Sequence, residues 1–575
     1  MQRTMQLAQQ EAVRYQVDAE LKIVPQLPSF EITSANGKAV ISAPDAVELL
    51  YGVYHFAEKF GGWSFFEPGK DVFNPARKKA IPADGILIPA KKPLLKRRGF
   101  IQEFPFNSET CDLLDWMAKN KLNYLLTWMK YYDELSDELK QAAVDRGIVI
   151  ESGHHNFDYW IPGKVYAPEF PEFFAEINGK RITPSGNTAL LMSEQLCTTN
   201  PELRTEIVRR MVEYCENHPE IKVIALMPND GFGWCECKEC SKFYDKNQKG
   251  DTYSISAHVY KADRIYHDMV KDISARLRAV RPDILLTFCA YVNYCAPSEN
   301  FTLEPGMAVH MAPYWRCINH PLDDPDCEIN SNYLRDIKQW TECKHGGEVN
   351  IYEYYMGVNF YLSLPMIHWE KMFREMRWYN ANNVDGVLTQ FHLPHWSVYG
   401  TNYRMMAQAA RGEDEKSAIA GMMDELFGKD AAEAESLYRE MEKLMQNMGK
   451  CHIPYPRSLF RRTQVADFEK FHTIAVNLAA KEPMDRLRNE LIVWTEYLLR
   501  FKKLFDRLIA KEATAAEVDE FLEWIHSFSS SRVFVHDRFD SYFTAVKEAI
   551  ASGSDWVHFN IDWEDNYILQ HDHTL

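Results

Sequence analysis

The sequence predicts an α/β fold: a (β/α)8 TIM barrel with a small N-terminal α/β domain and a C-terminal all-helical domain. At 575 residues the chain exceeds the usual domain size of about 100–200 residues, so several domains are expected. From about residue 95 to 410, strand patterns alternate with helical patterns, and beyond about 411 only helical patterns remain. The predicted domains are 1–92, 93–410 and 411–575.

The first 92 residues have the pattern of a small α/β unit. Short apolar runs predict strands at Leu21–Val24, Phe30–Ile32 and Lys38–Ser42. The turn Asn36-Gly37 indicates a hairpin between the last two runs. Asp45 can cap a helix that Gly61-Gly62 ends, and Lys91-Lys92-Pro93 indicates a linker.

Eight strands separated by helices predict the barrel. The strands are expected at Arg97–Glu103, Tyr124–Trp128, Val149–Ser152, Val223–Met227, Ile284–Ala290, Ala308–Ala312, Val349–Tyr354 and Gly386–Gln390. Asn200 and Pro201 predict the start of the helix before the fourth strand, and a long helix is expected at Ser256–Val280. An open doubly wound sheet is the alternative, but no GxGxxG or P-loop motif follows an early strand.

The sequence pattern of the last part of the chain favours a role in packing or oligomerisation rather than in catalysis. Amphipathic helices are expected at Ser417–Phe427, Ala431–Met448, Ala466–Lys481, Met484–Leu508, Ala515–Ser527 and Ser541–Ala551. No catalytic motif stands out there, and the oligomeric state stays open.

Composition excludes some function classes. The net charge of -17 disfavours nucleic acid as a partner, because phosphate binding needs clustered Lys and Arg. No run approaches the roughly 20 apolar residues of a membrane span. The start, Met1-Gln2-Arg3-Thr4, has no apolar signal core. We therefore expect a cytoplasmic protein, or a periplasmic or cell-surface protein whose signal has been removed.

Polar and aromatic residues follow the predicted strands, and the active site of a barrel lies at these carboxyl ends. The candidate catalytic residues are Asp230 and Asn229 after strand 4, Glu353 in strand 7, and Glu194 between strands 3 and 4. The candidate substrate-binding residues are Glu103, His154, His155, Tyr291, Asn293, Tyr314, Trp315, Tyr352, His392 and Trp396. Flat aromatic rings in loops suit the apolar faces of sugar rings.

Carboxyl groups at the rim of the predicted barrel could carry out the hydrolysis of a glycosidic bond. One carboxyl must protonate the leaving oxygen, and a second group must attack or stabilise the anomeric carbon. Each candidate also has a structural interpretation. Asp230 before Gly231 could form an Asx turn, Glu353 could pair with an Arg, and Glu194 could lie on the surface.

A cysteine cluster, Cys235, Cys237 and Cys240, follows Asp230 closely. Three thiols at this spacing could hold zinc, but no matching second cluster offers a fourth ligand. The pattern therefore favours a tight loop with small buried side chains. We expect no metal and no cofactor.

Two motifs carry a resemblance to known families. The segments from Gly52 to Gly62 and from Phe65 to Gly69 resemble the domain that precedes the barrel in α-glucuronidases and hexosaminidases. The segment Pro228-Asn229-Asp230-Gly231, followed by Trp234 and the cysteine cluster, is similar to glycoside hydrolase family 163. That family consists of gut-bacterial endo-β-N-acetylglucosaminidases that act on complex N-glycans.

The resemblance implies a retaining, substrate-assisted mechanism on the N-glycan of a glycoprotein. The 2-acetamido oxygen of the substrate would attack the anomeric carbon and form an oxazoline-like intermediate. In related hexosaminidases an Asp-Glu pair after strand 4 serves this reaction, whereas this chain has Asn229 and Asp230. Asn229 could hold the acetamido group with Asp230 as the acid. Alternatively, Asp230 could polarise that group while Glu194 or Glu353 supplies the proton.

Two other functions remain open. An α-glucuronidase-like hydrolase of acidic polysaccharide would need a basic residue for the uronate, and Arg316 is the obvious Arg at a strand end. A non-catalytic glycan-binding protein would keep the aromatic rim without a convergent carboxyl pair.

Overall fold

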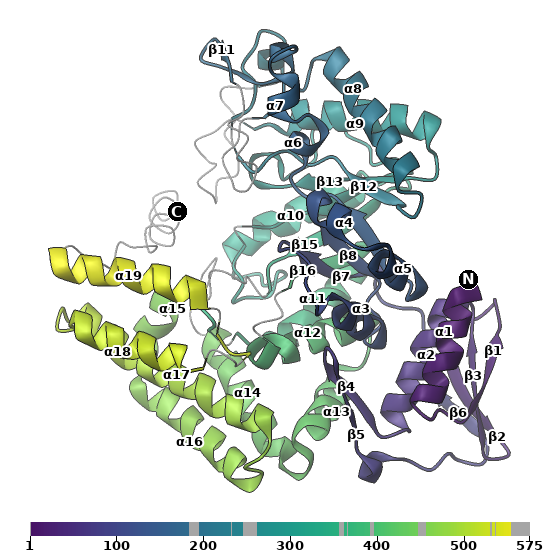
Figure 1. Ribbon diagram of the computed structural model, residues 1–575, viewed down its shortest axis with the longest axis vertical. Coiled ribbons are helices and arrows are strands. Elements are labelled where there is room, and N and C mark those ends of the chain that lie inside the picture. Colours follow the sequence, from purple (N-terminus) through teal and green to yellow (C-terminus); the bar gives the residue numbers. More distant parts are fainter. Residues whose placement is uncertain are drawn as a thin grey trace.

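A closed parallel barrel lies at the centre of the computed structural model (Figure 1). Its strands, in chain order, are β7 (Arg97–Gln102), β8 (Tyr124–Thr127), β9 (Val149–Ser152), β12 (Val223–Ala225), β13 (Leu285–Ala290), β14 (Met307–Met311), β15 (Glu348–Glu353) and β16 (Gly386–Gln390). The structure describes residues 2–182, 195–231, 233–244, 261–314, 316–355, 362–364, 366–391, 396–446, 456–528, 532–534 and 536–553. β16 pairs with β7 and closes the barrel.

The predicted (β/α)8 barrel is confirmed, with each strand end within two residues of its expected place. The helices around it are α3 (Thr110–Lys119), α4 (Met129–Glu134), α5 (Asp137–Asp145), α8 (Pro201–Asn217), α9 (Asp263–Val280), α10 (Glu328–Glu342), α11 (Trp369–Ala381) and α12 (Trp396–Arg411). The side chain of Asn200 accepts hydrogen bonds from the backbone of Glu202 and Leu203, so it caps α8 as predicted. The start of the helix expected from Ser256 lies outside the described residues.

Alternate residues of each barrel strand point inward, and a polar layer fills the interior below the rim. Glu151 of β9 accepts a hydrogen bond from Tyr124 at 2.5 Å and lies 2.7 Å from Nε2 of His310. Thr287 donates to the other carboxylate oxygen. All four side chains are buried, so this layer is a closed floor beneath the rim.

The N-terminal unit holds a sheet in the order β1-β3-β2-β6. Its elements are α1 (Gln2–Arg14), β1 (Ala19–Ile23), β2 (Glu31–Ala35), β3 (Lys38–Ala43), α2 (Ala46–Lys59), β4 (Trp63–Glu67), β5 (Lys70–Phe73) and β6 (Gly85–Ile88). β2 and β3 form the predicted hairpin, with positive φ angles at Asn36 and Gly37. The unit is joined to α12 by buried ion pairs, in which Arg404 binds Glu58 and Arg411 binds Glu48.

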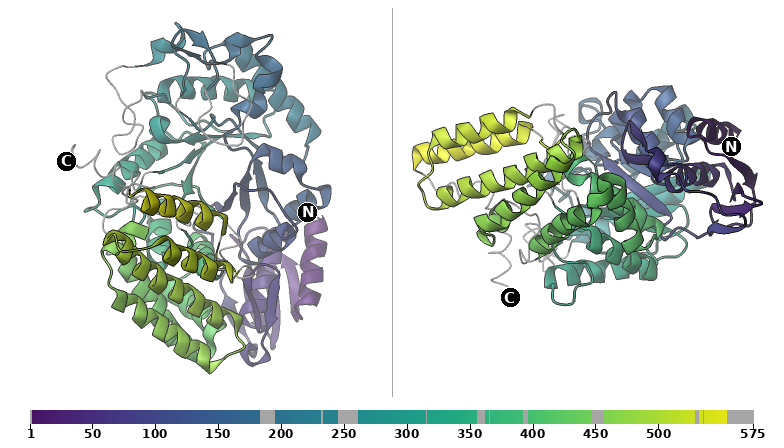
Figure 2. Two further views of the ribbon diagram at one scale, coloured as in Figure 1. Left: turned by 60° about the vertical axis from the view of Figure 1, so that its left-hand side comes forward. Right: turned by 90° about the horizontal axis from the view of Figure 1, so that it is seen from below.

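Helices alone form the described secondary structure after Arg411. They are α13 (Glu415–Phe427), α14 (Ala431–Gln446), α15 (Pro456–Arg461), α16 (Val465–Lys481), α17 (Arg486–Ile509), α18 (Ala515–His526) and α19 (His536–Ser552). Their far ends point away from the barrel, on the side opposite the N-terminal sheet (Figure 2). Among the described helices, none is both long and apolar enough to span a bilayer.

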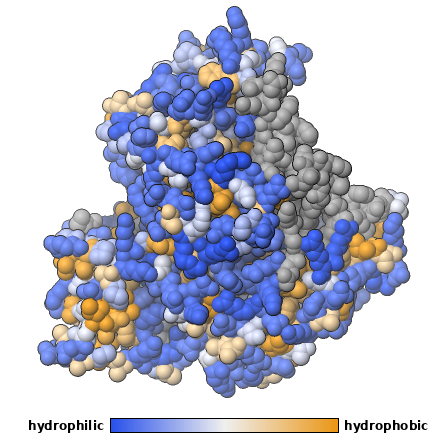
Figure 3. Space-filling view, turned by 180° about the vertical axis from the view of Figure 1, so that it is seen from behind, coloured by the Kyte–Doolittle hydropathy of each residue, from blue (hydrophilic) through white to orange (hydrophobic). Residues whose placement is uncertain are grey.

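The face opposite that of Figure 1 is largely hydrophilic (Figure 3). Several of the large exposed apolar side chains belong to the N-terminal unit, namely Val13, Ile23, Val72, Phe73 and Ile86.

Candidate active site

A carboxylate network lies at one side of the rim, where β7, β15 and β16 end. Glu103 accepts hydrogen bonds from Tyr352 at 2.5 Å and from the Gln390 amide at 3.1 Å. Nε2 of His154 lies 2.9 Å from the Tyr352 hydroxyl and 3.5 Å from Glu103. The predicted residues Glu103, His154 and Tyr352 are therefore brought together.

Glu103 is held in its ionised form. Burial acts to raise its pKa, but the hydrogen bond and charge of His154, with hydrogen bonds from Tyr352 and Gln390, lower the pKa to about 2. A carboxyl that stays ionised at neutral pH cannot donate the proton that a leaving group needs. Glu103 is suited to accept hydrogen bonds at the rim.

Replacing Glu103 by Gln should cost stability in a pH-dependent way. The folded-state pKa is depressed from 4.5 to about 2, so the carboxylate stabilises the fold above its ordinary pKa. Linkage puts this contribution at about 3 kcal/mol at neutral pH, and it disappears as the pH falls through the folded-state value. Urea unfolding of wild type and Glu103→Gln at pH 7, 5 and 3 should give a difference that shrinks with acidity. The exposed Glu304→Gln serves as the control, and an equal difference at all three pH values would contradict the assignment.

Two histidines after β9 hold an unusual backbone conformation. His154 and His155 have φ values of 103° and 39°, in the left-handed region that non-glycine residues seldom adopt. Nδ1 of His155 donates to the backbone carbonyl of Pro228 at 2.7 Å. Burial and the neighbouring charge of His154 lower the pKa of His155, so its ring is neutral with Nδ1 protonated. This contact joins the ends of the third and fourth strands.

Tyrosines form a wall beside the histidines, where the ring of Tyr291 lies 6.1 Å from that of His155. The ring of Tyr314 lies 5.6 Å from that of Tyr291 and 5.2 Å from that of Tyr354, measured between centroids. Burial raises the pKa of all three well above the ordinary value, and the negative charge of Asp230 adds to the effect. The hydroxyls are therefore protonated donors, and Asp230 lies near enough for its charge to act on all three.

The turn that carries Asp230 is clamped on both sides. The Gln195 amide donates to the carbonyls of Asn229 at 2.6 Å and Gly231 at 3.0 Å, and its oxygen accepts from the Asn229 backbone. The Asn229 side chain donates to Asp158 at 2.9 Å and accepts from the Asp158 backbone at 3.2 Å. In the described part of the chain, the Asp230 carboxylate has no hydrogen-bond partner.

Two predicted site residues lie away from the rim. Glu353 points outward from β15, where it binds Arg316 and accepts a hydrogen bond from Tyr379 of α11 at 2.9 Å. Trp396 starts α12 and is 1% exposed, with its ring 4.9 Å from that of Trp116 and 5.3 Å from that of Tyr403. The structure thus places Glu353 in the helix layer and Trp396 in the hydrophobic core.

Four predicted site residues remain, and the structure describes one of them. Asn293 is buried, and its carbonyl accepts from the backbone of Ala262 at 2.9 Å. Glu194, Trp315 and His392 lie outside the described residues.

Sequence reasoning missed several residues that shape the site. Gln195, Asp158 and Glu151 were not singled out, although Glu151 is a charged residue inside an apolar strand and so carried a signal. The expectation that the cysteine cluster lacks a fourth partner is wrong. Cys197, which precedes α8, lies against Cys237 and Cys240.

Comparison with known proteins gives one family and a set of similar folds. The family model described as Domain of unknown function (DUF4838) matches residues 85–439. No curated protein matches the sequence.

Several solved glycoside hydrolases have a similar fold. A family 89 glycoside hydrolase from Clostridium perfringens, in complex with its substrate GlcNAc-alpha-1,4-galactose, matches at a TM-score of 0.58 and 12% identity, over 91% of this chain and 65% of that chain. The same enzyme with 2-acetamido-1,2-dideoxynojirmycin matches equally well. A GH115 4-O-methyl-alpha-glucuronidase specific for decorated arabinogalactans matches at a TM-score of 0.50 and 12% identity, over 92% and 68%. This chain spans about two thirds of these proteins, and the likeness shows the fold.

Proposed function

The chain belongs to the DUF4838 family, whose description assigns no activity, and we propose that it is a glycoside hydrolase. More closely, we propose an endo-β-N-acetylglucosaminidase that releases complex N-glycans with retention of configuration. The rim carboxylates and the tyrosine wall support a glycan substrate. The fold shared with enzymes described as bound to N-acetylated sugars is consistent with it.

The proposed reaction is assisted by the substrate. The 2-acetamido oxygen attacks the anomeric carbon, the bond to the leaving oxygen breaks, and an enzyme acid transfers its proton to that oxygen. The intermediate is an oxazolinium ion, in which the former amide nitrogen keeps its proton and carries positive charge. The same enzyme group, now a base, takes a proton from water as the water oxygen attacks the anomeric carbon. The bond from that carbon to the acetamido oxygen breaks, and the acetamido group is restored with net retention.

One observation supports the assignment of roles: the Asn229 amide is already bound to Asp158, whereas the neighbouring Asp230 carboxylate has no hydrogen-bond partner among the described residues and lies near enough to the three tyrosines of the wall for its charge to raise their pKa values. A carboxylate there can accept the acetamido N–H and stabilise the positive charge that grows on that nitrogen. The neutral tyrosine hydroxyls can donate to the acetamido oxygen and direct it to the anomeric carbon. Asp230 is therefore proposed as the polarising residue, and Asn229 as a positioning residue.

Glu194 is the proposed acid and base. Glu103 is ionised, and Glu353 is directed into the helix layer, so neither suits the role. Glu194 directly precedes Gln195, whose amide contacts the residues on both sides of Asp230.

The α-glucuronidase alternative has little support at the rim. Arg316, its candidate for binding a uronate, is buried and paired with Glu353 and Glu375. A guanidinium engaged with two carboxylates behind the barrel wall is not available to a substrate.

Product analysis on a glycoprotein with complex N-glycans tests the proposal. We expect free glycan, and a protein that keeps a single N-acetylglucosamine on each former glycosylation site. Asp230→Asn should release glycan at least about 100-fold more slowly at the same enzyme concentration. Release of a uronic acid from acidic polysaccharide instead, or glycan binding without any product, would reject the proposed activity.

A further inference from the structure

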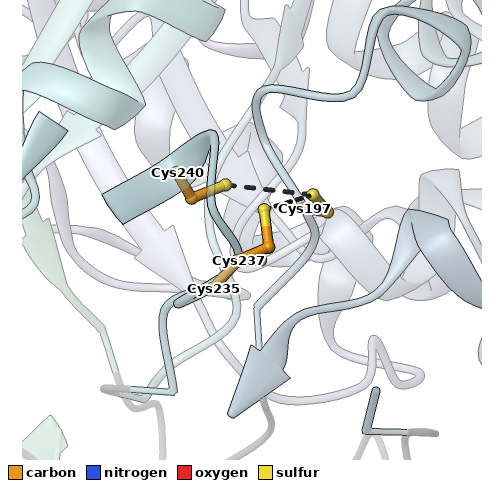
Figure 4. A group of neighbouring side chains, drawn as sticks. All are labelled: Cys197, Cys235, Cys237 and Cys240. Atoms are coloured by element: carbon orange, nitrogen blue, oxygen red, sulfur yellow. Dashed lines mark hydrogen bonds between the residues drawn. The ribbon is translucent and has the colours of Figure 1, made fainter. Parts of the chain in front are cut away.

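Four cysteines gather beside the turn that carries Asp230. Cys197 comes from the segment before α8, Cys235 and Cys237 from the loop after β12, and Cys240 from the start of η3 (Cys240–Phe243). All four are buried, and their sulfur atoms lie within 4.8 Å of one another (Figure 4). The first is separated from the others by the whole of α8 and β12 in the sequence.

The spacing of the sulfurs fits a tetrahedral ion. Sγ of Cys197 lies 3.7 Å from that of Cys237 and 3.8 Å from that of Cys240. Zinc binds thiolate at about 2.3 Å, so the edge of a ZnS4 tetrahedron is about 3.8 Å. A disulfide would need about 2.05 Å between sulfurs, and these cysteines are free. The pair Cys237 and Cys240 also has the two-residue spacing common in structural zinc sites.

Donors surround the sulfurs, as thiolates require. The backbone N–H of Glu176 donates to Sγ of Cys235 at 3.3 Å, and the Arg181 guanidinium lies 3.6 Å from the same sulfur. The Thr199 hydroxyl lies 3.1 Å from Sγ of Cys240. A zinc ion with four thiolates has a net charge of about −2, which these donors and the cationic guanidinium stabilise.

We propose that Cys197, Cys235, Cys237 and Cys240 bind one zinc ion in a closed structural site. On binding, four thiols release four protons to solvent, four Zn–S bonds form, and no electron is transferred. With four protein ligands the ion has no open position, so it supplies structure and not Lewis-acid catalysis.

The site joins two segments that hold the Asp230 turn. Gln195, two residues before Cys197, makes the hydrogen bonds to Asn229 and Gly231, and the other three ligands follow that turn. Zinc would fix both sides of this clamp. Loss of zinc should therefore also lower turnover, an effect that rests on the proposed function, whereas zinc binding itself does not.

Zinc content of the purified full chain tests the site directly. Elemental analysis should give about one zinc per chain, and X-ray absorption at the zinc edge should show four sulfur neighbours at about 2.3 Å. Cys197→Ser and Cys240→Ser should each abolish tight binding. Cys215→Ser, at a buried cysteine outside the group, should keep the full zinc content.

X-ray absorption is measured on the wild-type chain, so a folding defect in a variant cannot affect this result. A first shell of nitrogen or oxygen, a disulfide among the four cysteines, or a chain that takes up no zinc would overturn the proposal. So would zinc that survives Cys197→Ser but is lost in Cys317→Ser, because Cys317, His320 and Cys327 form a smaller thiol and imidazole group. If zinc binds as proposed and no glycan is released, only the proposed function fails.

Discussion

Asp230→Asn is expected to lower kcat by at least about 100-fold, the lower end for a positioned catalytic group. An amide keeps the shape of the side chain but cannot stabilise the positive charge on the acetamido nitrogen. Because this charge develops whichever group departs, the loss should be equally severe on glycoproteins and on activated aryl glycosides. Steady-state kinetics on a series of aryl N-acetylglucosaminides with different leaving-group pKa values measures this directly.

Two further variants separate the roles at the rim. Glu194→Gln should lose most on poor leaving groups and retain the first step on activated ones, because an acid matters least when the leaving group needs no proton. Asp158→Asn, which perturbs the clamp on Asn229, should cost less than Asp230→Asn. If Asp230→Asn shows the leaving-group dependence instead, Asp230 is the acid. Near-normal turnover of Asp230→Asn would show that Asp230 only forms the turn.

Arg316→Met should destabilise the protein by about 3–5 kcal/mol, since it strips the partner from buried carboxylates. Arg316 binds Glu353, and its Nη2 lies 2.5 Å from Glu375, with all three side chains almost fully buried. The Leu322 backbone also donates to Glu375 at 2.8 Å, so the network joins the loop after β14 to α11. Thermal and urea unfolding should both report the loss.

A variant that keeps the buried charges balanced supplies the control. Arg316→Met combined with Glu353→Gln should recover much of the stability, because the remaining Glu375 carboxylate is still offset by the charge of the buried Lys371. Glu353→Gln alone should lower stability and keep kcat within a few-fold. Lost turnover with unchanged stability would instead identify Glu353 as the acid.

The barrel was predictable because its strands are short apolar runs between helices with clear caps. The Asp45 and Asn200 caps and the Asn36-Gly37 turn all depend on neighbours in the sequence, and each is confirmed. The rule that sites form at the carboxyl ends of barrel strands was enough to single out Glu103, His154 and Tyr352. Local chemistry and one topological rule thus gave these elements.

The features that could not be predicted depend on the direction of a side chain or on contacts between residues far apart in the sequence. Glu353 sits at a strand end, but side chains alternate along a strand, and Tyr352 takes the inward position. Trp396 follows a loop-like sequence, yet packing against Trp116 places it in the core. Cys197 lies 38 residues before Cys235, so only the folded chain shows that they meet.

The outward position of Glu353 also bears on strand register. Met311 of β14 pairs with Ile351, and Glu353 pairs with Thr389 of β16. A shift of one residue in β15 would exchange the faces, turning Glu353 into the barrel mouth and Tyr352 toward α11. Such a shift would leave Arg316 without one of its carboxylates, so the buried ion pair disfavours the wrong pairing. The buried charge of Glu353 thereby favours the register in which Tyr352, and not Glu353, faces the barrel mouth and meets the substrate.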